Sequence, residues 1–310
     1  MKAYRGNTAD GVWVFDQVFP LAKTLRQEFD RRFSNVGPGG NEGRFVWDYW
    51  NVPDQYTLLR TPAAHFFGPK LFDGLTQSLL RFGRENFGCT GLTPPWLSCY
   101  VEGCQQQFHV DMPHGPLAYV WSLTPHQAAF VGGETQFIRP EVLDYWKNYD
   151  RWNGAESEAI VGKIAPRFGR LVVFDPRVPH GVSEVRGVHD VRKARLVIHG
   201  WFSNPQPAID GGLSPTNASR GIQEILADID GMVADQSLRG LISFSFMVSP
   251  AGKVGRLQVR ASTLQIAEPS HRLDASAIAQ IERSLGERIA QQEFARAKKP
   301  TRVTLPLVFD

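Results

Sequence analysis

The chain has 310 residues, a length compatible with one large domain or with two. Hydrophobic residues make up 42% of it and charged residues 21%, which is ordinary for a globular protein with a buried core. Because 34 basic and 31 acidic residues leave a formal net charge of only +3, the composition gives no argument for binding nucleic acid or an anionic membrane.

The cysteines and the N-terminal residues bear on the compartment. Cys89, Cys99 and Cys104 fit neither a disulfide framework nor a C-x-x-C zinc site, so we expect them to be reduced thiols. The N-terminal residues lack the apolar segment of a signal peptide, and no apolar run is long enough to span a membrane. The sequence therefore predicts a cytoplasmic protein without a membrane span.

Two amphipathic helices are predicted in the first third of the chain, after a short strand at residues 11–15. The first covers residues 16–33, with Asp16 as its N-cap, and the second covers residues 66–87, with Gly88 beyond its end. Both are indicated by apolar residues at intervals of three and four. These residues are Val18, Leu21, Ala22, Leu25 and Phe29 in the first helix and Leu71, Leu75, Leu79, Leu80 and Phe82 in the second.

The middle of the chain is rich in short β segments. Between residues 97 and 202 several strand-like runs are separated by Gly and Pro, a pattern typical of a sandwich or jelly-roll. A long insert with a helix-like stretch at residues 141–152 interrupts it between Phe137 and Gly169. Since such loops often shape substrate choice, the insert is predicted to be either a lid or an outer helix.

The last third of the chain has a composition and pattern of its own. Turn-forming residues at 206–215 indicate a linker, which separates a domain at 1–205 from a domain at 216–310. The second domain is predicted to have the order αββαβ. Its elements are a helix at 222–233, a hairpin at 241–248 and 254–259, a helix at 278–289 and a strand at 303–309.

Three residues in the β-rich region are candidate metal ligands. His109 and Asp111 are two residues apart on a strand-like run, so both point to one face of it. His180 follows the apolar strand-like run at 172–174. Two imidazoles and one carboxylate on one side of a metal leave coordination positions open, which is the arrangement of non-haem Fe(II) oxygenases.

With this triad, the order of the surrounding motifs resembles the Fe(II)- and 2-oxoglutarate-dependent dioxygenases, in their prolyl-hydroxylase-like branch. The resemblance covers about residues 96–203. It implies an α+β fold in which a double-stranded β-helix, or jelly-roll, is braced by the N-terminal helices. The motifs that carry it are Tyr100, His109 with Asp111, Gly132-Gly-Glu-Thr-Gln-Phe137, Gly169-Arg-Leu-Val-Val-Phe174, His180 and Arg195-Leu-Val-Ile-His-Gly-Trp-Phe202.

The resemblance also assigns the catalytic metal site. It implies that His109, Asp111 and His180 bind Fe(II), and that 2-oxoglutarate and O2 are cosubstrates, with ascorbate as a stimulant. Halogenases of this superfamily have a small residue in place of the carboxylate, which leaves a site for halide. Asp111 therefore favours hydroxylation or a related oxidation. An Fe(II) site also suits a reducing compartment.

A basic residue is expected to bind the far carboxylate of 2-oxoglutarate, because the planar guanidinium donates two parallel hydrogen bonds. By resemblance this residue is Arg195, at the start of the strand that ends in Trp201-Phe202. The gap from His180 is longer than is usual in the family, so Arg192 and Lys193 remain alternatives. Tyr100 and Thr135 are predicted by resemblance to lie beside the cosubstrate.

The sequence thus predicts a dioxygenase that hydroxylates an unactivated C–H bond of a peptide, an amino acid or a related small molecule. The alternative is a non-catalytic jelly-roll binding protein with a structural or vestigial metal site. The domain at 216–310 resembles the C-terminal domain of TonB-like proteins, in phrases such as Gly252-Lys-Val254 and Leu305-Pro-Leu-Val-Phe309. This second resemblance implies docking to a protein partner or homodimerisation, and a purely structural role is the alternative.

Overall fold

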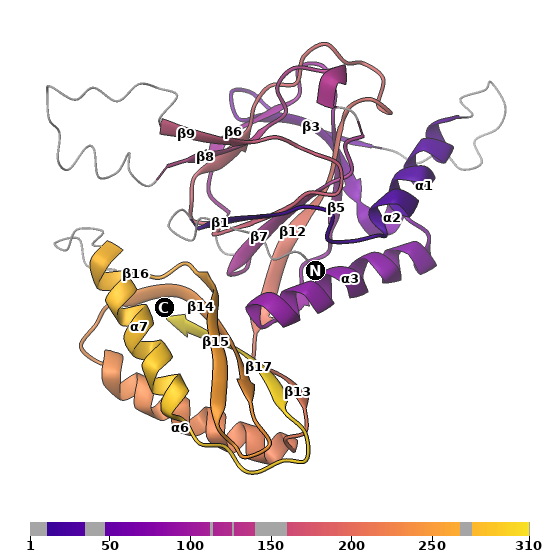
Figure 1. The fold of residues 1–310 in the computed structure, drawn as a ribbon. Helices are drawn as coiled ribbons and strands as arrows, with labels where there is room; N and C mark the ends of the chain where they lie inside the picture. The colour runs from indigo at the N-terminus through magenta and orange to yellow at the C-terminus, as the bar shows by residue number, and fades with distance from the viewer. Residues whose placement is uncertain are drawn as a thin grey trace, which may run out of the picture. The chain divides into compact units, whose positions relative to one another are not determined.

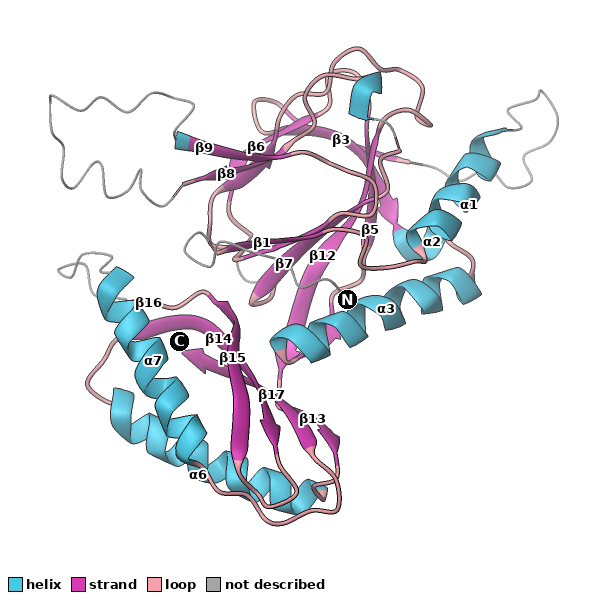
Figure 2. Cartoon of the chain, viewed as in Figure 1, coloured by secondary structure: helices cyan, strands magenta, loops and turns pink. Residues whose placement is uncertain are grey.

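The structure is a computed structural model that describes residues 11–34, 47–111, 114–125, 127–139, 160–266 and 275–309 (Figures 1 and 2). The chain divides into two compact units. The first consists of residues up to 79 together with 92–203, and the second of 80–91 together with 204 onward. The predicted insert between Phe137 and Gly169 lies largely outside the described residues.

The first unit is built on one large antiparallel sheet that curls into a jelly-roll, as predicted. Its strand order is β1-β10-β7-β12-β5-β3-β6-β11-β8-β9, and β2 pairs with β3. Strand β3 pairs with both β5 and β6, so it joins the two halves of the curled sheet. The strands are β1 (Val12–Phe15), β2 (Asp48–Val52), β3 (Tyr56–Pro62), β5 (Trp96–Tyr100), β6 (Gln105–His109), β7 (Leu117–Ser122), β8 (Thr135–Ile138), β9 (Val161–Ile164), β10 (Leu171–Phe174), β11 (His180–Val182) and β12 (Arg195–Pro205).

Helices brace the outer side of this sheet, which confirms the expected arrangement. They are α1 (Ala22–Ser34), the short α2 (Ala63–Phe66) and α3 (Pro69–Phe87), and a short 3-10 helix (Gln127–Ala129) occurs further along the chain. In α1, Leu25 and Phe29 are fully buried. The guanidinium of Arg26 in the same helix donates to the backbone carbonyls of Leu123, at 3.3 Å, and Arg192. The helix is thus fixed to the sheet by both apolar packing and hydrogen bonds.

The predicted start of the first helix was wrong. The helix begins at Ala22, and Asp16 is not its N-cap. The Asp16 carboxylate instead accepts hydrogen bonds from the guanidinium of Arg170, at 2.7 and 2.9 Å. Because Gln17 adopts a positive φ of 56° and Pro20 follows, the chain turns here before the helix can start. Asp16 therefore forms an ion pair with a residue that is distant in sequence and does not cap the helix.

The second unit contains the expected αββαβ elements and two short additional strands. Its sheet has the order β13-β17-β14-β15, with β16 paired to β14, and its two helices lie on one face of it (Figure 2). Their apolar sides and the strands form one core, which includes Ile225, Phe244 and Leu305. The elements are β13 (Ala208–Gly211), α6 (Pro215–Val233), β14 (Leu238–Val248), β15 (Val254–Ser262), β16 (Gln265–Ile266), α7 (Ala275–Gln291) and β17 (Thr301–Phe309).

Residues 80–91 belong to the second unit although they precede most of the first in sequence. They include the end of α3 and the beginning of β4 (Cys89–Leu92). The hydroxyl of Ser243 donates to the carbonyl of Phe87 at 2.5 Å, and that of Thr304 donates to the carbonyl of Glu85 at 3.2 Å. In the segment predicted as a linker, residues 208–211 form β13, and Ser214 caps α6 by accepting from the backbone N–H of Asn217.

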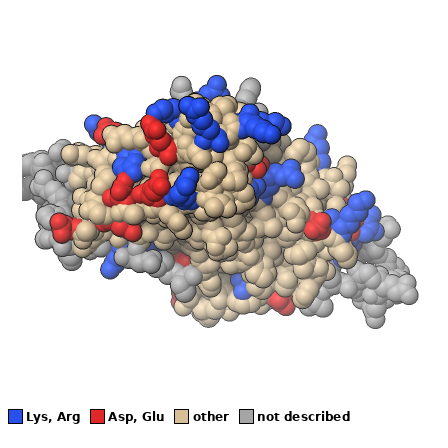
Figure 3. Space-filling view, turned by 90° about the horizontal axis from the view of Figure 1, so that it is seen from below, with Lys and Arg blue, Asp and Glu red and all other residues tan. Residues whose placement is uncertain are grey.

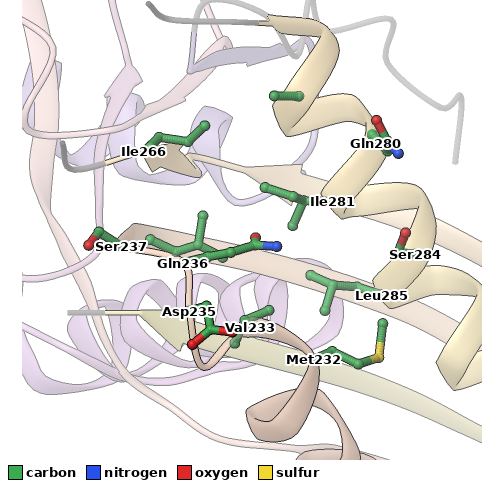
Figure 4. Close-up of a pocket in the computed structure, with 12 residues that line it drawn as sticks. Met232, Val233, Asp235, Gln236, Ser237, Ile266, Gln280, Ile281, Ser284 and Leu285 are labelled. Carbon is green, nitrogen blue, oxygen red and sulfur yellow. The ribbon is translucent and has the colours of Figure 1, made fainter. Parts of the chain in front are cut away.

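A pocket of about 560 Å³ opens in the second unit between the end of α6, β16 and α7 (Figure 4). Asp235 is the one acidic group among the lining residues that the structure describes. The pocket thus offers apolar volume but no set of groups for acid–base or metal chemistry. Its apolar lining residues are Met232, Val233, Leu238, Ile266, Ala277, Ile281 and Leu285.

The distribution of charged side chains on the surface agrees with the nearly equal numbers of basic and acidic residues. Lys and Arg side chains are interspersed with Asp and Glu on the face that Figure 3 shows. None of the helices that the structure describes combines the length and the hydropathy that a membrane crossing requires.

Candidate metal centre and cosubstrate pocket

The pairing of β6 with β11 brings the three candidate ligands together. His109 and His180 are direct cross-strand partners, with ring centroids 4.4 Å apart. Asp111 follows β6, and its backbone N–H donates to the carbonyl of Pro176 at 3.0 Å. The Asp111 carboxylate lies 3.4 Å from Nε2 of His109 and 3.1 Å from Nε2 of His180. The potential ligand atoms of all three residues lie within 4.8 Å of one another.

Backbone carbonyls orient both imidazoles. Nδ1 of His109 lies 2.9 Å from the carbonyl of Gln107, and Nδ1 of His180 lies 2.9 Å from the carbonyl of Val178. Because a carbonyl only accepts hydrogen bonds, each Nδ1 carries the proton, and in the neutral ring Nε2 has a free lone pair. Both Nε2 atoms face the Asp111 carboxylate: when protonated they donate to it, and when neutral they can bind a cation beside it. This is the tautomer and orientation that histidine ligands of a metal require.

The electrostatics of the triad favour a cation. Burial opposes ionisation of Asp111, but hydrogen bonds from His109 and His180 outweigh it and hold the pKa of the carboxyl well below its usual range. The site thus presents one carboxylate and two imidazole nitrogens. This donor set suits Fe(II) and leaves coordination positions for other ligands.

Arg195 lies in the interior of the jelly-roll and is only 1% exposed. Its guanidinium carbon lies 4.4 Å from the centroid of the Tyr100 ring, and Nη2 donates to the hydroxyl of Thr135 at 3.3 Å. Nε and Nη1 are buried and have no hydrogen-bond partner among the described residues. Burial lowers the pKa of Arg195, as expected for a cation with little compensation. Unpaired buried donors of this kind fit an anionic ligand.

The alternative basic residues lie in different surroundings. Arg192 is exposed and pairs with Asp190 at 3.2 Å, and Lys193 is exposed as well. Tyr100 and Thr135, in contrast, are 3% and 4% exposed and both contact Arg195. The structure therefore brings Arg195, Tyr100 and Thr135 into one buried cluster that does not include Arg192 or Lys193.

Gly133 makes room for the Arg195 side chain. It has a φ of 73°, and a Cβ atom at this position would lie 3.1 Å from Cδ of Arg195 and 2.9 Å from the ring of Phe130. Only glycine combines this backbone conformation with so close an approach.

Gln106 is a site residue that the sequence did not identify. Its side-chain amide lies 3.1 Å from Nε2 of His109, and its amide oxygen accepts from the hydroxyl of Tyr100 at 3.4 Å. Gln106 thus connects the candidate metal ligands to the Arg195 cluster. Strict strand alternation puts positions 106 and 109 on opposite faces, but the pairing register shifts between His180 and Val182. Such a bulge re-aims side chains, and no residue of β6 signals it.

Comparison with known proteins agrees with this geometry. Residues 95–203 match the model of the 2OG-Fe(II) oxygenase superfamily. A search of curated proteins found no match. The match to the family model and the His-Asp-His cluster show that this region is a 2OG-Fe(II) oxygenase domain, a kind of enzyme that uses Fe(II), 2-oxoglutarate and O2. The resemblance of the second unit to TonB-like proteins stays a prediction.

Similar solved structures include a prolyl-4-hydroxylase from Pseudomonas putida, with 17% identity, 64% of this chain and 94% of that chain covered, and a TM-score of 0.41. AviO1 from Streptomyces viridochromogenes has 19% identity, with 64% and 91% covered and a TM-score of 0.43. HygX from Streptomyces hygroscopicus, solved with nickel and 2-oxoglutarate bound, has 14% identity, with 62% and 82% covered and a TM-score of 0.41.

Replacing Asp111 with Asn should weaken Fe(II) binding by at least about a hundredfold, because it removes the one anionic donor of the cluster. Anaerobic titration with Fe(II), or with Mn(II) as a substitute, measures the affinity. The control is Asp190→Asn, which removes a carboxylate that pairs with Arg192 outside the cluster. Equal metal affinity in the wild type and Asp111→Asn would show that Asp111 is not a ligand.

Replacing Gly133 with Ala should displace Arg195 and weaken 2-oxoglutarate binding about tenfold while metal binding is retained, since the added Cβ meets Arg195 and Phe130. Gly187→Ala is a matched control, because Gly187 also has a positive φ of 89° but has nothing within 4 Å of an added Cβ. Isothermal titration of both variants with 2-oxoglutarate measures the effect. The same loss in both would assign it to backbone strain alone.

Proposed function

We propose that this protein is an Fe(II)- and 2-oxoglutarate-dependent dioxygenase in which His109, Asp111 and His180 bind iron and Arg195 binds the far carboxylate of 2-oxoglutarate. The observation that carries this assignment is the buried Arg195 guanidinium, whose unpaired donors lie in the same interior as the triad. A metal site without catalytic function does not require a second, buried cation of this kind nearby.

The proposed reaction converts 2-oxoglutarate, O2 and a substrate C–H group into succinate, CO2 and an alcohol. One oxygen atom of O2 enters succinate and the other enters the hydroxyl group, so atoms and electrons balance without a further reductant. Bound Fe(II) would supply the activation of O2 that couples the oxidative decarboxylation to the oxidation of the C–H bond. Ascorbate is expected to stimulate turnover.

The residues of the chain would position the cosubstrate and hold the metal. Nε and Nη1 of Arg195, which have no hydrogen-bond partner among the described residues, can each donate to a carboxylate oxygen. The hydroxyl of Thr135 accepts a hydrogen bond from Nη2, and the Tyr100 ring covers one face of the guanidinium. These contacts fix the position of the guanidinium before the ligand binds. Halogenases of this superfamily have a small residue at the position of Asp111. The carboxylate of Asp111 therefore supports hydroxylation rather than halogenation.

The substrate is proposed to be a peptide, an amino acid or a related small molecule, because the motif order is that of the prolyl-hydroxylase-like branch. This support is an analogy of fold and motif. The need for Fe(II) and three free, buried cysteines support a reducing, cytoplasmic compartment. Docking or homodimerisation remains the proposed role of the second unit.

The first experiment is substrate-free turnover. Protein loaded anaerobically with Fe(II) and then given 2-oxoglutarate, ascorbate and air should form succinate slowly, and His180→Ala should form none because it lacks one metal ligand. Succinate is measured by chromatography with mass detection. Wild-type protein that binds Fe(II) but neither binds 2-oxoglutarate nor forms succinate would favour the non-catalytic binding protein.

Replacing Arg195 with Gln should raise the 2-oxoglutarate concentration needed for half-maximal succinate formation at least about tenfold, because the loss of a charge-assisted pair costs this much or more. Fe(II) affinity should stay within about twofold of the wild type. Arg192→Gln is the matched control, since Arg192 is exposed and pairs with Asp190. A larger effect of Arg192→Gln than of Arg195→Gln would transfer the anchor role to Arg192.

A further inference from the structure

A second cation, Arg60 on β3, is held between two indole rings. Its guanidinium carbon lies 3.2 Å from the ring centroid of Trp50 on β2 and 4.2 Å from that of Trp96 on β5. The two rings are themselves 6.4 Å apart and nearly perpendicular. Cation–π contacts of this kind fix both the position and the orientation of a guanidinium.

Aromatic rings contact the planar faces of the Arg60 guanidinium, but its hydrogen-bond donors are not all paired. Nε is buried and has no hydrogen-bond partner among the described residues. Burial lowers the pKa of Arg60 and outweighs the effects of Tyr56, Tyr100 and Asp48, which raise it. Asp48, its cross-strand partner on β2, is exposed. Since stacking covers the planar faces and leaves the edge free, the N–H groups remain available to an anion that approaches in the plane.

Strand pairing puts Arg60 on the same interior face as the cosubstrate pocket. Arg60 is the cross-strand partner of Ser98, and Ser98 is the partner of Val197. On the same two strands Tyr100 is the partner of Arg195. Because alternate residues of a strand share a face, the side chains of Arg60 and Arg195 project from one side of the sheet.

Ser98 and His199, which share this face of the sheet, are uncharged. His199, on β12, lies 2.8 Å from the hydroxyl of Ser98. Burial, followed by the charges of Arg60 and Arg195, lowers the pKa of His199 to about 3, so this ring is neutral at pH 7. The interior therefore has two separate cationic positions, Arg60 and Arg195. If Arg195 binds a carboxylate of 2-oxoglutarate, Arg60 remains available for another anion.

We propose that Arg60, clamped by Trp50 and Trp96, binds a carboxylate of the substrate and so selects acids over their neutral analogues. The proposal rests on the function proposed above, because it assigns Arg195 to 2-oxoglutarate. It narrows the substrate class to compounds with a carboxylate, such as a free amino acid or a peptide with an exposed carboxylate. The guanidinium would orient the substrate in the interior that also contains the metal ligands.

The test uses the full chain labelled with ¹⁵N-arginine and loaded with Zn(II) and 2-oxoglutarate, and it follows the Nε–H resonance of Arg60. N-acetylglycine, a small carboxylate, should shift this resonance saturably with a dissociation constant in the millimolar range. N-acetylglycinamide, the matched neutral compound, should not. The resonance is assigned by its loss in Arg60→Lys, or by its displacement in Trp50→Phe, which changes the ring current over Arg60.

The outcomes separate this proposal from the preceding one. If 2-oxoglutarate binds saturably but N-acetylglycine does not shift the Arg60 resonance, the proposed carboxylate site at Arg60 is wrong. The proposed dioxygenase function is not affected by that result. Equal shifts by the acid and the amide overturn the carboxylate site as well. Failure of the wild type to bind 2-oxoglutarate would refute the assignment of Arg195, on which the proposal rests. An Arg195→Gln sample checks that N-acetylglycine does not act through that residue.

The source of the carboxylate is decided in the same titration. Glycine represents a free amino acid, N-acetylglycine represents the C-terminus of a peptide, and an acetylated and amidated Gly-Glu-Gly peptide represents an acidic side chain. The compound that binds most tightly to the wild type and at least tenfold more weakly to Arg60→Gln identifies the source. Arg220→Gln, an exposed arginine of α6, is the control for the loss of one positive charge. No discrimination between Arg60→Gln and Arg220→Gln would overturn the site.

Discussion

The antiparallel pairing of β6 with β11 is the constraint on which the candidate metal centre depends. It puts His109 directly opposite His180, and Asp111 is held two residues further on by its backbone hydrogen bond to Pro176. A shift of one residue in this register would turn one imidazole to the other face of the sheet. The curled sheet that encloses the pair therefore has to form in one register for the candidate ligands of β6 and β11, which are distant in sequence, to meet.

The first unit contains two arginines with unsatisfied hydrogen-bond donors. Arg195 and Arg60 each have buried N–H groups without a hydrogen-bond partner among the residues that the structure describes, and aromatic rings cover their planar faces. Such groups destabilise a folded protein unless something pairs with them. Anionic ligands would supply that pairing, so ligand binding and the stability of this interior are expected to be coupled. The aromatic contacts keep both side chains in place without using their donors.

The division into two units depends on contacts that are distant in sequence. Residues 80–87 belong to α3 and continue its apolar pattern, yet the carbonyls of Phe87 and Glu85 accept hydrogen bonds from Ser243 and Thr304. Periodicity reports only which side of a helix is buried and not which part of the chain covers it. For the same reason Asp16 looked like a helix cap in the sequence, although its carboxylate pairs with Arg170.

The sequence by itself determined the class of the fold, the jelly-roll, the bracing helices and the identity of the three candidate ligands. It could do so because strand alternation and helical periodicity are local properties of the chain, and because the order of the motifs around His109, Asp111 and His180 resembles a known family. Only the tertiary structure separated buried Arg195 from exposed Arg192 and Lys193, since burial depends on the whole sheet. The bulge that brings Gln106 to His109 and the rings that clamp Arg60 were likewise decided by strand pairing, which joins residues that no local pattern connects.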